Sequence, residues 1–244
     1  MESLVTKQMK MLKGKTSIIT GGTKGIGYGV AQTLLSNGMN VAISSRSEKA
    51  AKEAAEALGD RCLGVQADVR DLASQQKMVQ ETINKFGAVD AMIANAGVGH
   101  FGDILELTTE QWNEVIDVNL TGVFYSTKAS MDALIKSNGY LITIASLAGT
   151  NFFAKGSAYN ASKFGLVGFT QAVMMDVRDK GVKVSTIMPG SVSTHFNNHT
   201  PSDADSWKIQ PEDIGKLVFD LLTMHPRTLP SKVEVRPSMP SKKK

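Results

Sequence analysis

The stretch that decides the fold is Thr20-Gly21-Gly22-Thr23-Lys24-Gly25-Ile26-Gly27, which follows a short apolar segment and leads into a helical one. Glycines suit this place because the backbone must turn tightly and approach a pyrophosphate closely, and the helix N-terminus presents free N–H groups to it. An ordinary glycine-rich turn is the alternative. The strand–turn–helix context favours a dinucleotide-binding turn, whose contact residues are Gly21, Thr23, Lys24, Gly25, Ile26 and Gly27.

Short apolar runs alternate with longer amphipathic ones from this turn to the end of the chain. The short runs predict strands at 17–20, 40–44, 62–66, 89–94, 140–145, 182–188 and 232–235. The longer ones predict helices near 25–37, 47–58, 71–86, 109–136, 157–180 and 211–224. Such alternation implies right-handed βαβ units. We therefore predict an α/β fold, a single doubly wound Rossmann-type domain with a parallel sheet of about seven strands and helices on both faces.

Three helix starts carry a capping signal. Thr108 followed by Gln111 is a capping-box pattern, Pro211 suits the first helical position, and Asp71 can cap the helix near 71–86. These signals fix helix boundaries that periodicity alone leaves open.

One domain at 13–237 is expected, because no linker, repeat or low-complexity stretch interrupts the pattern. We expect residues 1–12 and the basic tail 238–244 to be disordered. No apolar run is long enough for a transmembrane helix, and the N-terminus lacks the apolar core of a signal peptide. The single cysteine, Cys62, cannot form a disulfide within the chain, which fits a reducing compartment. A cytoplasmic location and no membrane association are therefore expected.

The formal net charge of +4 does not indicate a nucleic-acid-binding protein. Three of these charges belong to the terminal lysines 242–244, and the rest of the chain is close to neutral. A nucleic-acid partner needs a basic stripe or face on the folded domain rather than a solvated tail. We expect no nucleic-acid partner.

The end of the second strand predicts the choice of nucleotide. Folds that prefer NAD usually place Asp or Glu about 20 residues past the glycines, to bind the ribose 2′-hydroxyl. This chain has Ser45-Arg46-Ser47 instead, so that Arg46 can accept a 2′-phosphate between two hydroxyls, with Lys24 as a second cation. A solvated first turn of a helix is the alternative for Arg46. NADP(H) is the predicted cofactor.

Several further motifs occur in a fixed order between residues 14 and 235. They are Asp68-Val69, Ala94-Asn95-Ala96-Gly97, Asn119, Ser146, Tyr159-Asn160-Ala161-Ser162-Lys163, and Pro189-Gly190 with Thr194. Together with the glycine turn they resemble the classical short-chain dehydrogenase/reductase family over nearly the whole chain. Ala94 replaces a more frequent Asn, which leaves the catalytic positions intact.

Tyr159 and Lys163 are the predicted catalytic pair. They are four residues apart on a predicted helix and therefore project from one face. A tyrosine hydroxyl titrates near pH 10, and a neighbouring ammonium favours its phenolate. We expect Tyr159 to exchange the proton as general acid and base; the resemblance implies that Lys163 also holds the nicotinamide ribose.

Ser146 and Asn119 complete the predicted catalytic set. Ser146 lies just beyond the fifth strand, where open α/β sheets place ligand groups, and its hydroxyl would bind the substrate oxygen. A turn or capping serine is the alternative. Asn119 is a poor residue for a helix interior. The resemblance gives Asn119 the role of holding a water that connects Lys163 to solvent.

The resemblance assigns the remaining cofactor contacts. Asp68 would contact adenine with Val69 beside it, and the segment Asn95-Ala96-Gly97 would line the adenosine ribose. Pro189, Gly190, Val192 and Thr194 follow the sixth strand and would cradle the nicotinamide carboxamide and the phosphates.

The four histidines do not form a metal site, because none has acidic or cysteine neighbours at ligand spacing. His195 and His199 lie in the segment 195–210, which in the family covers the substrate, and we expect them to be solvated loop residues rather than pocket residues. Phe152 and Phe153 either form an apolar wall of the substrate site or pack beneath this lid.

The predicted function is NADPH-dependent hydride transfer between the nicotinamide and a ketone or secondary alcohol, such as a 3-oxoacyl group, a 3-hydroxy acid or a similar small carbonyl compound. Relatives that act on acyl carrier protein tend to carry arginines where this chain has Ser137-Asn138 and Met175, which weakens that reading. A catalytically silent NADP(H) sensor or scaffold is the alternative, and a lyase or epimerase is a third. A homo-oligomer, tetramer or dimer, is expected through the helices at 109–136 and 157–180.

Overall fold

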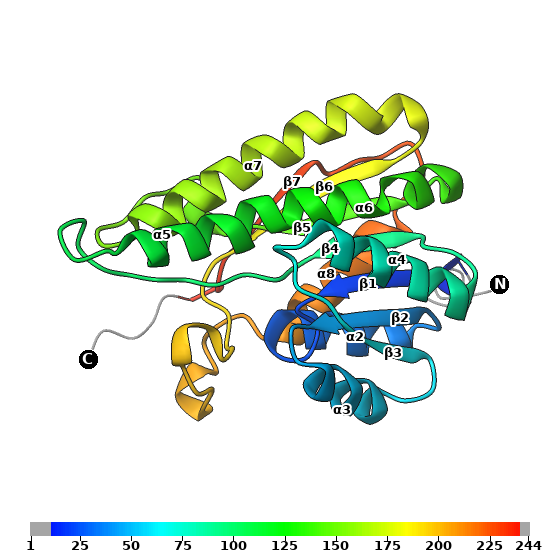
Figure 1. The fold of residues 1–244 in the computed structure, drawn as a ribbon, viewed down its shortest axis with the longest axis horizontal. Coiled ribbons are helices and arrows are strands. Elements are labelled where there is room, and N and C mark those ends of the chain that lie inside the picture. Colours follow the sequence, from blue (N-terminus) through cyan, green and yellow to red (C-terminus); the bar gives the residue numbers. More distant parts are fainter. Residues whose placement is uncertain (1–10, 240–244) are drawn as a thin grey trace.

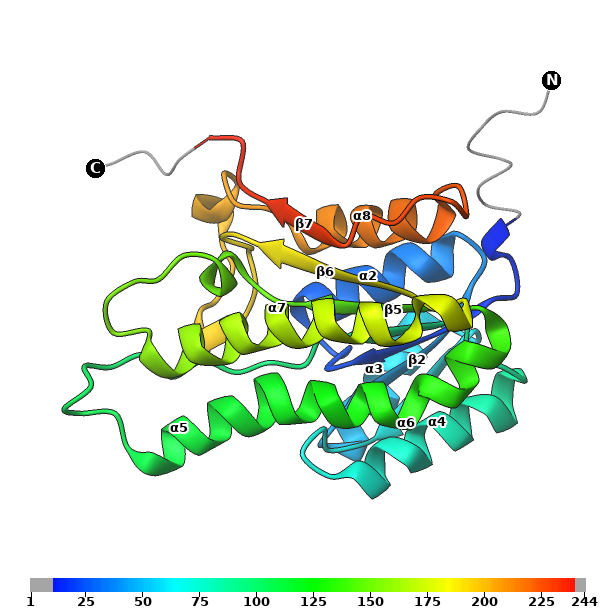
Figure 2. The same ribbon diagram turned by 90° about the horizontal axis from the view of Figure 1, so that it is seen from above.

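The computed structural model describes residues 11–239 as one parallel sheet covered on both faces (Figures 1 and 2). The sheet order is β3-β2-β1-β4-β5-β6-β7, and every neighbouring pair is parallel. The strands are β1 (Thr16–Thr20), β2 (Asn40–Ser45), β3 (Cys62–Gln66), β4 (Ala91–Ala94), β5 (Tyr140–Ile144), β6 (Lys183–Pro189) and β7 (Lys232–Val235). The strand order reverses between β1 and β4, which is where such sheets open a crevice for ligands. The predicted fold class is confirmed.

The helices divide between the two faces of the sheet. They are α2 (Gly25–Ser36), α3 (Glu48–Leu58), α4 (Leu72–Phe86), α5 (Thr109–Ile116), α6 (Gly122–Ser137), α7 (Ser157–Val177) and α8 (Pro211–Thr223). Figure 2 shows α2 and α8 above the sheet and α4, α6 and α7 below it. No helix within residues 11–239 is long and apolar enough to cross a membrane.

Alternating strand residues divide the interior into two apolar cores. Ile19 faces the core beneath α2 and α8, whereas its neighbour Ile18 faces the core beneath α4, α6 and α7. Both side chains are fully buried. All five residues of β1 are buried because helices cover both faces of the sheet, although Thr16, Ser17 and Thr20 carry hydroxyl groups.

The three capping predictions are confirmed. Thr108 and Gln111 form a reciprocal capping box, the Asp71 carboxylate accepts a hydrogen bond from the backbone N–H of Ala73, and Pro211 opens α8. The Thr108 and Asp71 side chains satisfy N–H groups that have no partner within the helix, whereas Pro211 has no N–H at a position where one would lack a partner.

Both ends of the described chain are more ordered than expected. Residues 1–10 and 240–244 lie outside the described residues. Leu12, assigned above to a disordered extension, is buried in the core beneath α2. Ser238 and Met239, assigned to a disordered tail, line the main cavity. An apolar side chain within reach of the core or cavity removes surface from water, which charge and composition alone do not reveal.

The helix predicted at 109–136 is confirmed, but it contains a π-helical turn near its middle. α5 ends at Ile116, a π-helical turn spans Asp117–Thr121, and α6 begins at Gly122. Such a turn inserts a residue into the helical ladder and is frequent at functional sites. Asn119 lies in its middle.

Candidate functional site

A cavity of about 1930 Å³ opens at the carboxyl ends of the strands. Its walls come from the segments that follow β1, β2, β3, β4, β5 and β6, together with the start of α7 and the segment after β7. Open α/β sheets bind ligands at this edge, next to the point where the strand order reverses.

The turn between β1 and α2 has the shape that a pyrophosphate requires. Gly21 and Gly25 have φ values of +64° and +56°, in the left-handed region that favours glycine. A Cβ at Gly21 would lie 3.1 Å from the Cα of Ala96, so the close approach of the two segments excludes a larger residue. The first turn of α2 has no side-chain cap and no acidic residue. Its free N–H groups and positive dipole fit a phosphate anion.

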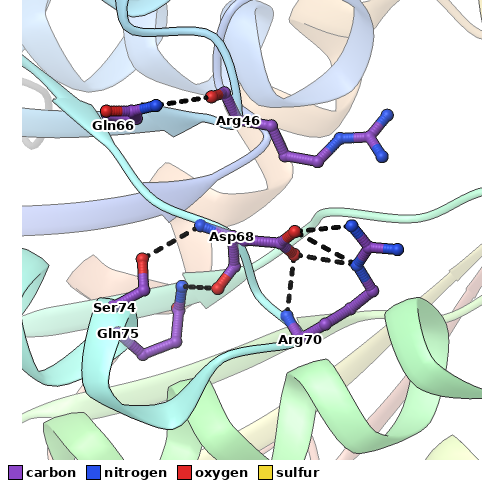
Figure 3. A network of polar contacts seen from close by, with 6 residues as sticks. All are labelled: Arg46, Gln66, Asp68, Arg70, Ser74 and Gln75. Atoms are coloured by element: carbon purple, nitrogen blue, oxygen red, sulfur yellow. Dashed lines mark hydrogen bonds and ion pairs between the residues drawn. The ribbon is translucent and has the colours of Figure 1, made fainter.

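Arg46 after β2 and Asp68 after β3 line one end of the cavity (Figure 3). The Arg70 guanidinium binds the Asp68 carboxylate in a two-pronged ion pair, with an Nη2–Oδ2 distance of 2.6 Å. This pairing lowers the pKa of Asp68. The backbone carbonyl of Arg46 accepts a hydrogen bond from the Gln66 amide. The Arg46 guanidinium has no hydrogen-bond partner among the described residues. The ion pair of Asp68 with Arg70 is not evident from the sequence pattern.

Three predicted catalytic side chains meet beside the carboxyl end of β5. Ser146 follows β5, and Tyr159 and Lys163 project from one face of α7 into the same cavity. The Lys163 Nζ lies 5.7 Å from the Tyr159 ring centroid and donates a hydrogen bond of 3.0 Å to the carbonyl of Ile144. The Ser146 hydroxyl accepts a hydrogen bond of 3.1 Å from the N–H of Ala148, as a capping serine does, and it lies near enough to the Tyr159 hydroxyl to lower the pKa of Tyr159.

The pKa of Tyr159 differs from the sequence prediction. Burial raises its pKa above the ordinary value of a tyrosine, and the nearby Ser146 hydroxyl opposes this only in part. We expected the Lys163 ammonium to lower this pKa. Burial instead lowers the pKa of Lys163 itself to about 8, because a desolvated ammonium is disfavoured.

Asn160, the residue after Tyr159, connects α7 to the loop after β5 through hydrogen bonds. No role was predicted for it from the sequence. Its buried amide donates hydrogen bonds to the carbonyls of Ala148, at 2.8 Å, and Asn151, at 2.9 Å. Gly149 lies so close to the helix that a Cβ there would be 2.7 Å from the Lys163 carbonyl. These contacts hold Ser146 and Tyr159 in register. In the sequence, the position of Asn160 directly after Tyr159 was the feature that could have indicated this role.

Asn119 is fully buried in the π-helical turn and does not line the cavity. Its Oδ1 accepts a hydrogen bond of 2.8 Å from the N–H of Val98, and its Nδ2 donates to the Val98 carbonyl and to the Ser162 hydroxyl. The side chain thus joins the segment after β4 to α7, one residue from Lys163.

Most of the predicted cofactor residues line the cavity. They are Gly21, Thr23, Lys24, Gly25, Ile26, Ser45, Arg46, Asp68, Val69, Asn95, Ala96, Gly97, Tyr159, Lys163, Pro189, Gly190, Val192 and Thr194.

Two predicted contact residues lie outside the cavity lining and have structural positions instead. Ser47 caps α3 by accepting a hydrogen bond of 3.2 Å from the N–H of Ala50. Gly27 lets α2 approach the sheet, because a Cβ there would lie 2.6 Å from the Asn95 amide. Both positions result from tertiary packing. The motif alone does not show whether such a residue contacts the ligand or packs within the protein.

The segment after β6 folds around a buried carboxylate. Asp205 accepts from Lys208, at 2.6 Å, and from the His199 ring, and these partners lower its pKa to about 2. His195 and His199 are exposed loop residues, as expected, and both also border the cavity. The His199 side chain pairs with Asp205 and remains 41% exposed.

The residues that sequence reasoning missed most clearly are aromatic neighbours of Tyr159. The ring centroids of Phe101 and Phe196 lie 5.4 Å and 5.7 Å from that of Tyr159. Phe101 comes from the loop between β4 and α5, for which the sequence offers no periodicity. Phe152 and Phe153 both line the cavity, but Phe152 is 87% exposed.

Within residues 11–239, no group of three or more His, Cys, Asp or Glu side chains has a geometry that would hold a metal ion. The two histidine–carboxylate pairs, His100 with Glu114 and His199 with Asp205, each lack a third ligand of these types.

Known proteins share this fold and its motifs. A 3-oxoacyl-[acyl-carrier-protein] reductase of Escherichia coli is 32% identical over 206 residues, 84% of each chain. Another from Synechocystis is 34% identical over 226 residues, covering 88% of this chain and 92% of the relative. Among solved structures, an alcohol dehydrogenase of the archaeon Thermococcus sibiricus, complexed with 5-hydroxy-NADP, superimposes with a TM-score of 0.84 at 28% identity, over 92% of this chain and 97% of that one.

The match extends through the cavity described above. The family model of the short chain dehydrogenases covers residues 15–205, from β1 through the catalytic helix α7 to the buried carboxylate Asp205. With more than three quarters of its length matched, this chain belongs to the short chain dehydrogenase family of oxidoreductases.

Proposed function

We propose that this protein is an NADPH-dependent oxidoreductase that interconverts a ketone and a secondary alcohol, with a 3-oxoacyl compound, a 3-hydroxy acid or a similar small carbonyl compound as substrate. The observation that carries the proposal is the convergence of Ser146, Tyr159 and Lys163 in one cavity with the glycine turn at the N-terminus of α2. When bound, the nicotinamide cofactor supplies the hydride for reduction or accepts it for oxidation.

Tyr159 is the proton donor in reduction. Burial raises its pKa, so the phenol form that donates a proton predominates at neutral pH. The Ser146 hydroxyl, which lines the same cavity, would bind the substrate oxygen and stabilise the charge that develops there. Together these two groups orient the carbonyl and supply its proton.

Lys163 and Asn119 serve the proton supply. The Lys163 ammonium, with a pKa lowered to about 8, can lose and regain a proton near neutral pH. Asn119 holds the Val98 backbone and the Ser162 hydroxyl, and so fixes the wall behind this ammonium. We assign to Asn119 a positioning role in returning protons to Lys163, and to Lys163 the further role of holding the nicotinamide ribose.

A preference for NADP(H) over NAD(H) is supported by the charges around Arg46. The carboxylates nearest to it are engaged elsewhere, because Asp68 pairs with Arg70 and Glu114 pairs with His100 at 2.7 Å. The Arg46 charge is therefore left for a ligand. A guanidinium presents two parallel N–H donors to a phosphate, which suits the 2′-phosphate of NADP(H).

Arg46→Ala is expected to weaken NADPH binding by about 10- to 100-fold, the value of one charge-assisted contact, and NADH binding by much less. Fluorescence titration of the reduced cofactors measures both dissociation constants. Lys49→Ala is the matched control, since Lys49 is an exposed cation of the neighbouring α3 that does not line the main cavity. Equal losses for the two cofactors would contradict the assignment.

The proposed activity is tested by mixing the protein with NADPH or NADH and a panel of ketones, 3-oxo esters and 3-oxoacyl thioesters, and following the near-ultraviolet absorbance of the reduced cofactor. Oxidation that prefers NADPH and is lost in Tyr159→Phe supports the proposal. Tight NADPH binding without turnover of any ketone would favour the silent sensor or scaffold, for which the convergence of Ser146, Tyr159 and Lys163 has no use. A lyase or epimerase would retain its cofactor without net oxidation.

We also propose that the protein assembles into a homo-oligomer, a dimer or tetramer, through α6 and α7. These helices run side by side on one face of the molecule (Figure 2) and expose Phe124, Phe164 and Met175. Burying such side chains against a second copy removes apolar surface from water. Light scattering is expected to give a multiple of the chain mass; a monomer mass would refute the assembly.

A further inference from the structure

The catalytic tyrosine lies in a cluster of aromatic rings. The centroids of Phe101 and Phe196 are 6.3 Å apart and each lies within 6 Å of the Tyr159 centroid, so the three rings form a triangle. Phe153 extends this cluster, with its centroid 5.9 Å from that of Phe101. These distances are those of favourable tilted and edge-on aromatic pairs. Phe153 and Phe196 line the cavity itself.

Glycines make room for these rings from two separate loops. A Cβ at Gly99 would lie 2.7 Å from the Phe196 ring and 2.9 Å from the Phe101 ring. A Cβ at Gly156 would lie 2.5 Å from the Phe153 ring. The local backbone is thus shaped around the aromatic side chains, which makes the cluster a built feature of the site.

The aromatic cluster is only partly covered by the chain itself. Phe101, Phe153 and Phe196 are between 37% and 48% exposed, although each contacts another ring. Uncovered apolar surface that borders a ligand cavity marks a place for an apolar part of the ligand.

Two of the cations that line the cavity are already paired. Lys208 is bound to Asp205 at 2.6 Å and Arg236 to Glu234 at 3.1 Å. The other lysines and arginines lining the cavity lie in the glycine turn, at the end of β2 and in α7, whereas Lys155, two residues from Phe153, does not line it. Within the described residues, the loops that carry Phe153 and Phe196 therefore place no unpaired lysine or arginine in the cavity lining for a substrate carboxylate.

We propose that the substrate is an uncharged ketone with an aromatic ring next to the carbonyl, and that this ring packs on Phe153 and Phe196 while the oxygen meets Tyr159 and Ser146. The inference rests on the proposed reductase function. In the reaction the carbonyl carbon receives a hydride from NADPH, its oxygen receives the Tyr159 proton, and the C=O π bond is lost. The products are a secondary alcohol and NADP⁺, and the tyrosine regains its proton from solvent through Lys163.

Three ketones separate the features of this proposal: acetophenone, butan-2-one without the ring, and 4-acetylbenzoate with a carboxylate on the ring. Two quantities are measured, kcat/KM with NADPH and the dissociation constant of each ketone from the complex with NADP⁺. Acetophenone is expected to have a kcat/KM at least roughly tenfold higher, and a dissociation constant at least roughly tenfold lower, than each of the other two ketones. Butan-2-one lacks the buried ring, and 4-acetylbenzoate carries a carboxylate without a partner.

Phe196→Ala is expected to reduce the preference for acetophenone over butan-2-one to within about threefold, because the ring loses one of its packing partners. Leu105→Ala is the matched control and is expected to keep the preference. Leu105 lies in the same loop as Phe101, is 93% exposed and does not line the cavity. Equal melting temperatures verify that both variants fold.

The outcomes distinguish this inference from the proposed function. Turnover of butan-2-one or 4-acetylbenzoate at least as fast as acetophenone would overturn the aromatic substrate class and leave the reductase function standing. Selective binding of acetophenone to the NADP⁺ complex without any turnover would support the aromatic site and overturn the reductase function. Failure of that complex to bind acetophenone more tightly than butan-2-one would overturn the inference whether or not turnover is seen.

Discussion

Tyr159→Phe is expected to lower kcat for ketone reduction by about 10²- to 10⁴-fold, the range that a positioned general acid contributes. Phenylalanine keeps the ring that packs between Phe101 and Phe196 but removes the hydroxyl that donates the proton. The loss therefore falls on the proton transfer. NADPH oxidation in the presence of a saturating ketone measures it.

The binding of NADPH and the thermal stability are expected to remain close to those of the parent protein, because the aromatic packing is retained. Tyr125→Phe is the matched control, since Tyr125 lies on α6 outside the cavity lining. A Tyr159→Phe variant that reduces ketones at the parent rate would show that another group supplies the proton.

Lys163→Met is expected to abolish ketone reduction and, at the same time, to stabilise the fold by about 2 kcal/mol at pH 7. Burial lowers the pKa of Lys163 from 10.5 to about 8, which corresponds to a penalty of about 3 kcal/mol on the buried ammonium. Loss of its hydrogen bond to the Ile144 carbonyl offsets about 1 kcal/mol of the gain. Methionine fills a similar volume without a charge.

The stability of the parent protein has a pH dependence that follows from the same pKa. Below pH 8 both the folded and the unfolded chain carry the Lys163 proton, and the folded state bears the full cost of the buried charge. Between about pH 8 and 10.5 the unfolded chain holds one more proton than the folded one, so the free energy of unfolding rises with pH. The advantage of Lys163→Met is therefore greatest below pH 8 and is lost as the pH approaches 10.5.

Urea denaturation of the parent and the variant across pH 6.5 to about 10.5 measures this difference. Lys77→Met is the control, because Lys77 is an exposed cation of α4 whose replacement should change the free energy of unfolding by less than about 0.5 kcal/mol. A Lys163→Met protein that is less stable than the parent at pH 7 would contradict the buried-charge argument. A lysine retained at such a cost is consistent with selection for function rather than for stability.

The sequence determined the parts of this protein that depend on local pattern. The alternation of short apolar runs and amphipathic segments predicted the sheet and its covering helices, since these periodicities follow from strand and helix geometry. Caps such as the Thr108 box act within four residues and were equally predictable. The order of the motifs carried the family, and most of the cofactor residues named from it line one cavity.

The remaining features depend on contacts between distant residues. Ser45 lines the cavity, whereas Ser47 caps α3. Only the path of the backbone decides which of these two positions a serine takes. The π-helical turn at Asn119 interrupts a stretch that reads as one continuous helix. The pKa of Tyr159 is raised, opposite to the expected direction, because the surrounding chain desolvates its hydroxyl and the nearby Ser146 hydroxyl opposes this only in part.

The sequence left Phe153 either in an apolar wall of the substrate site or beneath the lid, and only the tertiary structure brought it together with Phe101 and Phe196. Phe101, Phe153 and Phe196 lie in three loops without periodicity, separated by more than 40 residues from one another, and meet only where the sheet brings those loops together. The local sequence pattern predicts the backbone hydrogen bonding of each segment and the face on which its apolar side chains lie. The nucleotide site is built on one strand–turn–helix unit and could therefore be predicted from the sequence. The aromatic part of the substrate site is built from loops that share no local pattern, and these residues come together only in the folded molecule.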